Sequence, residues 1–70
     1  MKTLNAKTRS ELRGYLARLL ERKTEQPATA EGERTAHFIT GAIAGAEQTA
    51  ALLRASGYLT TEQMKEIVKP

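Results

Sequence analysis

The side chains best suited to acid–base chemistry are few in this sequence and lie close together. His37 is the only histidine, and Glu33 lies one helical turn before it, so the two could share a hydrogen bond. Thr35 and Thr40 offer hydroxyl groups at the same short range. General acid–base catalysis requires titratable groups paired in a shielded pocket, and a chain of 70 residues has little room for one. We therefore expect His37 to be structural or exposed, and we predict that the protein is not an enzyme.

The remaining residue types offer no metal or cofactor site. The chain has no cysteine, which excludes disulfides and thiolate ligands, and one histidine with scattered glutamates falls short of a metal-ligand set. No glycine-rich turn follows a strand pattern, as a phosphate-binding loop requires. The sequence thus predicts no catalytic residue, no cofactor and no metal.

Basic charge is concentrated at the N-terminal end. Residues 1–23 hold seven basic and two acidic side chains, a net charge of +5, whereas residues 24–70 hold four basic and six acidic, a net charge of −2. The candidate contacts for phosphate or for an acidic partner are Arg9, Arg13, Arg18, Arg22 and Lys23. Such a helix suits nucleic acid, an anionic membrane or an acidic protein surface, and charge alone does not choose among them. A nucleic-acid-associated function therefore stays open as an alternative.

The predicted fold begins with a helix, which carries these basic side chains, followed by a linker. A first helix is expected over residues 9–23, because Thr8 and Glu11 form a capping box at its start and leucines recur along it at helical spacing. Residues 24–30 are expected to form a linker, since Pro27 lacks an amide donor and disfavours helix in the residue before it. The pattern is typical of a helical hairpin.

Two further helices are expected after the linker. The second spans residues 30–56 and ends at Gly57, the left-handed residue of a Schellman stop. At roughly 1.5 Å per residue it is about 40 Å long, nearly twice the first helix. The third spans residues 61–68 after a capping box of Thr60 and Gln63, and should fold back on the end of the second.

The long second helix is predicted to have two apolar sides. One is a narrow seam with alternating spacings of three and four residues: Ala36, Ile39, Ile43, Ala46, Ala50 and Leu53. The other is a second line: Phe38, Ala42, Gly45 and Leu52, with Gly41 between the two. Gly41 and Gly45 have the spacing of a close helix crossing, or else pack tightly against the first helix. One helix covers only one side, which leaves the other for the third helix, a second copy or a foreign partner.

The fold class we predict is all-α: a helical hairpin with one long central helix and a short C-terminal third helix, dimerising into a bundle. A domain this small buries little surface by itself, which favours a homodimer. The predicted self-association or partner surface comprises Phe38, Ile39, Gly41, Ala42, Ile43, Gly45, Ala46 and Leu52. The predicted function is that of a small non-catalytic interaction or regulatory protein, which binds and occupies a surface of a protein partner as adaptors and inhibitors do.

The predicted helices can be compared with two nucleic-acid-binding modules. In a helix-turn-helix the third helix would read DNA, but it exposes Glu62 and Glu66 where phosphates favour basic residues. A ribbon-helix-helix, which would pair residues 2–6 between two chains, stays as a minor alternative.

The N-terminal residues lack the continuous apolar stretch of a secretory signal. Residues 38–46, the longest weakly apolar run, fall far short of the roughly 20 residues that span a bilayer. We therefore expect a cytoplasmic protein without a membrane partner.

Overall fold

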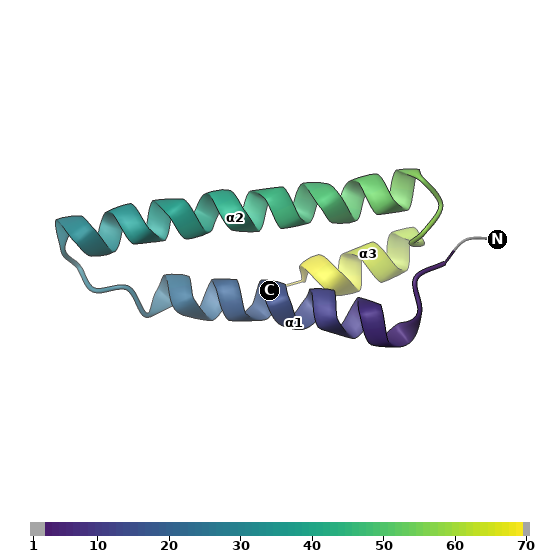
Figure 1. The fold of residues 1–70 in the computed structure, drawn as a ribbon, viewed down its shortest axis with the longest axis horizontal. Helices are drawn as coiled ribbons and strands as arrows, with labels where there is room; N and C mark the ends of the chain where they lie inside the picture. The colour runs from purple at the N-terminus through teal and green to yellow at the C-terminus, as the bar shows by residue number, and fades with distance from the viewer. Residues whose placement is uncertain (1–2, 70) are drawn as a thin grey trace.

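The computed structural model describes residues 3–69, which form three helices and no strand (Figure 1). Helix α1 spans Ala6–Thr24, α2 spans Ala30–Ala55 and α3 spans Thr61–Val68. Helices α1 and α2 run antiparallel along the 48 Å long axis, and α3 folds back to pack against both. The predicted all-α fold, a hairpin with a short third helix, is therefore confirmed.

Helix α1 begins at Ala6, three residues earlier than the sequence indicates. The N-cap is Asn5, whose extended backbone (φ −71°, ψ 164°) lets its side-chain oxygen accept a 2.8 Å hydrogen bond from the amide of Thr8. The predicted capping box of Thr8 and Glu11 is wrong, because Thr8 is already inside the helix. Asparagine is at least as good an N-cap as threonine, so both sites satisfy the local rule. In the structure the helix begins after the earlier of the two caps, Asn5.

A tight turn leads into α2. The side chain of Thr29 accepts a 3.0 Å hydrogen bond from the amide of Gly32, which caps the helix. Gly32 is buried against the carbonyl group of Pro27, and a Cβ atom added there would collide with that carbonyl. The turn therefore needs glycine at this position for lack of space, although its φ is ordinary.

The turn between α2 and α3 follows the sequence signals closely. Gly57 has a φ of +86°, and the amide of Tyr58 donates a 2.8 Å hydrogen bond to the carbonyl of Leu53, as in a Schellman motif. The amide of Gln63 then donates to the Thr60 hydroxyl at 3.1 Å, while the Gln63 side chain accepts from the Thr60 amide at 3.0 Å. The Schellman stop and the capping box predicted for α3 are both confirmed.

The core lies where all three helices meet. Each helix, and the turn before α3, contributes at least one buried side chain to it: Leu16, Ala50, Leu59 and Ile67. Leu19 of α1 and Ile39 of α2 are buried as well. No polar or charged residue is buried within residues 3–69, so the interior is held by apolar packing.

Candidate interaction surface on the central helix

Part of the predicted association surface is already covered within the chain. Ile39 is 3% exposed, and Ile43 and Ala46 are half-buried against the core cluster that α1 and α3 supply. These three side chains belong to the apolar seam of α2, and the seam packs inside the monomer. Packing within the chain therefore covers Ile39 and partly covers Ile43 and Ala46, three residues of the surface expected from the sequence.

The second apolar line of α2 is open to solvent. Phe38 is 80% exposed and Leu52 is 62% exposed, while Gly41 and Gly45 are exposed and Ala42 is half-buried. A Cβ atom added at either glycine would meet nothing within 4 Å, so neither glycine packs against α1. We refer to these five residues as the outer face of α2.

Helix geometry explains why the outer face has no cover. Phe38, Gly45 and Leu52 are spaced by seven residues, which keeps them on one side of a helix. At 3.6 residues per turn, this line and the seam are separated by roughly 120° around the helix axis. Both α1 and α3 lie on one side of α2 (Figure 1), and the seam residues Ile43, Ala46 and Leu53 pack against the core to which both helices contribute. No other element of residues 3–69 is left to cover the outer face.

The outer face is also uncharged. Between Phe38 and Leu52 the only acidic or basic side chain is Glu47, which follows Phe38 by nine residues, or about 2.5 turns, and so lies on the opposite side. Thr49, four residues after Gly45, lies on the same side of the helix, and its hydroxyl donates a 2.9 Å hydrogen bond to the carbonyl of Gly45. The face is therefore uncharged, and its one hydroxyl group between Phe38 and Leu52 already donates to the backbone.

A hollow adjoins the outer face at its N-terminal end. It has a volume of about 430 Å³ and is lined by Glu31, Arg34, Thr35 and Phe38. The hollow is open to solvent, and both acidic and basic side chains border it. Charged side chains therefore border the apolar outer face at its N-terminal end.

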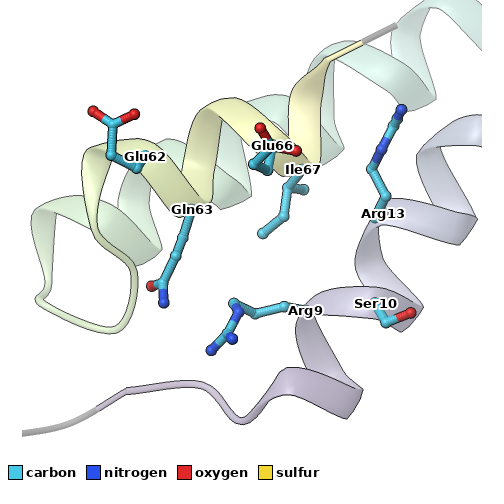
Figure 2. Close-up of a pocket in the computed structure, with 7 residues that line it drawn as sticks. All are labelled: Arg9, Ser10, Arg13, Glu62, Gln63, Glu66 and Ile67. Carbon is cyan, nitrogen blue, oxygen red and sulfur yellow. The ribbon is translucent and has the colours of Figure 1, made fainter.

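A second cavity, of about 370 Å³, lies between α1 and α3 (Figure 2). Its lining residues are Arg9, Ser10 and Arg13 from α1 and Glu62, Gln63, Glu66 and Ile67 from α3. Basic side chains thus come from one wall and acidic side chains from the other. The Arg9 guanidinium is already engaged, because its Nη1 donates a 2.6 Å hydrogen bond to the carbonyl of Leu4.

The five predicted phosphate contacts do not form one basic stripe. Arg9 and Arg13 are half-buried beside the glutamates of α3. Arg18 follows Arg9 by nine residues, or about 2.5 turns, so it lies on the opposite side of α1, and Arg22 lies one turn further along that side. Arg18, Arg22 and Lys23 are exposed. The structure therefore divides the basic residues between two sides of the helix.

His37 is exposed on α2. The hydroxyl groups of Thr35 and Thr40 donate to the carbonyls of Glu31 and Ala36, at 3.1 and 2.9 Å, and not to the imidazole. Within residues 3–69 no group of three or more histidine or acidic side chains is arranged to hold a metal ion.

The ribbon-helix-helix alternative does not fit the first described residues. Residues 3–5 form no strand, and the amide of Leu4 is bonded within its own chain to the carbonyl of Tyr58. Lys2, at the start of the segment proposed to pair, lies outside the described residues.

Comparisons with known proteins identify no relative of this chain. No family model matches the chain, and searches of curated proteins and of solved structures find no match. None of the helices in the described part of the chain combines the length and the hydropathy of a membrane span.

Proposed function

We propose that this chain is a non-catalytic interaction protein that binds and occupies a surface of a protein partner, in the manner of an adaptor or inhibitor. One observation carries the proposal: Phe38 and Leu52 lie exposed on the uncharged outer face of a helix whose other apolar side is already packed. Large apolar side chains left exposed on an uncharged helix face support a role for that face in binding. Aromatic side chains such as Phe38 are also enriched where binding energy is concentrated.

The same face supports association of two copies into a helical bundle. A domain of this size covers a small share of its surface on folding, and the chain has no cysteine for a disulfide. Burying the outer face against a second copy would remove large apolar side chains from water without disturbing the core. We therefore propose a homodimer whose interface is the outer face of α2.

Self-association is tested by analytical ultracentrifugation over a range of micromolar concentrations. We expect the wild type to dimerise and Phe38→Glu to remain monomeric with unchanged helix content, because Phe38 is 80% exposed and its replacement leaves the core intact. Thr40→Glu is the matched control, since Thr40 is exposed on another side of α2. Ile43 is unsuitable for this test because a charge there would enter the core. A wild type that stays monomeric throughout would refute the dimer.

Partner binding is tested by affinity capture with the wild type, Phe38→Glu and Thr40→Glu, followed by titration of the purified captured protein. A partner of the outer face should bind the wild type and Thr40→Glu with equal affinity and bind Phe38→Glu at least tenfold more weakly, a loss of about 1.4 kcal/mol. Equal binding to all three proteins would contradict the proposed surface.

The alternative function is contact with nucleic-acid phosphates through α1. It is supported by the exposure of Arg18, Arg22 and Lys23 at the C-terminal end of that helix. It is opposed by the glutamates of α3, which would repel a phosphate near Arg9 and Arg13.

Fluorescence anisotropy with duplex and single-stranded oligonucleotides decides between the two functions. In roughly 150 mM salt, where screening leaves only close contacts, we expect no binding tighter than micromolar. Submicromolar binding that falls steeply with salt and weakens in Arg18→Gln/Arg22→Gln would replace the interaction-protein proposal with the nucleic-acid one.

A further inference from the structure

We infer that the cavity between α1 and α3 binds a small zwitterion, an α-amino acid with an apolar side chain, whose carboxylate meets Arg13 and whose ammonium group meets Glu66. All the residues that line this cavity belong to α1 and α3. The inference therefore goes beyond the partner surface proposed on α2 and does not depend on it.

The two walls of the cavity carry opposite charges at matching spacing. Helices α1 and α3 pack together and run in the same direction (Figure 1). Arg13 follows Arg9 by four residues and Glu66 follows Glu62 by four, so each pair lies along one side of its helix, about 6 Å apart. In Figure 2 the Arg9 side chain extends toward Gln63, while Arg13 lies toward the end of α3 that carries Glu66.

The charges that border the cavity do not neutralise one another. Within residues 3–69, the side chains of Arg13, Glu62 and Glu66 make no ion pair or hydrogen bond. Arg13 is nevertheless half-buried, so part of its guanidinium has lost water without gaining a partner. A ligand carboxylate would supply that partner, in the planar paired geometry that arginine favours.

Gln63 and Arg9 add hydrogen-bond donors to the same space. The Gln63 side-chain oxygen accepts a 3.0 Å bond from the Thr60 amide in the capping box, so the NH2 group of Gln63 is the part left for a ligand. The Arg9 Nη1 is bonded to the Leu4 carbonyl, while its Nε and Nη2 are left. Both helices thus present donors to the cavity, as recognition of a carboxylate requires.

The balance of charge favours a zwitterion over a simple ion. Two basic and two acidic side chains line the cavity, so their formal charges cancel. A phosphate or a simple carboxylate would be attracted by Arg13 and repelled by Glu66, and a simple amine would meet the reverse. An α-amino acid carries both charges on one carbon atom, so each of these side chains can face a charge of opposite sign.

The size and the apolar part of the cavity fit a molecule of this class. Its volume of about 370 Å³ is close to the lower end of the roughly 300–1,000 Å³ of small-molecule sites. Ile67 and the alkyl stems of the charged residues give an apolar ligand side chain a surface to pack on. Because the cavity is open to solvent and the ligand is small, we expect a dissociation constant of about 1 mM.

NMR titration of the 15N-labelled wild type with leucine tests the inference. We expect saturable shifts confined to the amides and arginine side chains that line the cavity. Two analogues of similar size separate the charges, since isocaproate lacks the ammonium group of leucine and isoamylamine lacks its carboxylate. Each analogue should bind about fivefold more weakly or worse, because each leaves one wall of the cavity without its counter-charge.

Two variants assign the charges to residues. Glu66→Gln should weaken leucine about fivefold while leaving isocaproate unchanged or tighter, since the repelling carboxylate is gone. Arg13→Gln should weaken leucine to a similar extent while leaving isoamylamine unchanged or tighter. Arg18→Gln, on the opposite side of α1 from Arg9, is the matched control and should bind leucine as the wild type does.

The opposing outcomes are distinct from a failure of the fold. Glu66 is exposed, so Glu66→Gln keeps the test decisive even if Arg13→Gln does not fold. A wild type in which leucine shifts no resonance at the cavity would overturn the inference. Isocaproate or isoamylamine binding as tightly as leucine would overturn the zwitterion, as would a folded Glu66→Gln protein that loses all three ligands alike.

Discussion

The backbone amide of Leu4 donates a 3.0 Å hydrogen bond to the carbonyl oxygen of Tyr58, which joins the segment before α1 to the turn between α2 and α3. The carbonyl of Leu4 in turn accepts the bond from Arg9, and the Leu4 side chain packs against the core cluster. The amide and the side chain of Leu4 thus hold two distant parts of the chain together, while its carbonyl is bonded to Arg9 of the adjoining helix. The position of α3 is coupled to the start of α1 through this contact.

Arg9→Gln should weaken this junction. The variant loses a part-buried hydrogen bond from a charged donor, and we expect the free energy of unfolding to fall by about 1.5 kcal/mol, the low end for such bonds. Urea denaturation followed by circular dichroism measures the change. Arg18→Gln, at an exposed position of the same helix, should change stability by less than about 0.5 kcal/mol. Equal effects of the two variants would show that the bond to Leu4 contributes nothing.

Asn5→Ala should destabilise the protein by about 1 kcal/mol, because Asn5 is the residue whose side chain caps α1. Thr8→Ala should be neutral or slightly stabilising, since Thr8 lies exposed within the first turn and alanine has the higher helix propensity. Thermal melts of the two variants compare the sites directly. The reverse order of stabilities would place the cap at Thr8.

Gly32→Ala should lower the free energy of unfolding by about 1–3 kcal/mol, the usual effect of overpacking, because the added methyl group collides with the Pro27 carbonyl. Gly14→Ala is the matched control. There the new Cβ meets only the flexible end of Arg18, at 3.4 Å, and the higher helix propensity of alanine should add up to about 1 kcal/mol. Opposite signs in urea denaturation are the expected result, and a stabilising Gly32→Ala would contradict the close approach.

Ile67→Ala should release α3 from the core. Ile67 is 2% exposed, and truncating a buried isoleucine costs about 2–5 kcal/mol, a large share of the stability of so small a domain. We expect amide exchange to accelerate throughout α3. Lys65→Ala, at an exposed position of α3, should leave the exchange rates unchanged. Undiminished protection in Ile67→Ala would show that α3 is held by other contacts.

The sequence by itself determined the helices and most of their ends. The Schellman stop at Gly57 and the capping box of Thr60 and Gln63 depend on groups within a few residues of one another, so local spacing is sufficient to predict them. The start of α1 was missed because Asn5 and Thr8 are both good N-caps. The residue before the Asn5 cap, Leu4, is hydrogen-bonded to Tyr58, and a contact between residues so far apart in the chain cannot be predicted from local spacing.

Only the tertiary structure decided which side of α2 is covered. Both apolar lines were candidates by periodicity, and the predicted surface accordingly mixed Ile39 and Ile43 with Phe38 and Leu52. Helices α1 and α3 both pack on the seam, whose branched side chains bury more apolar area than a line interrupted by glycines. The outer face remains exposed because that choice depends on contacts between segments distant in sequence, which the spacing within one helix does not encode.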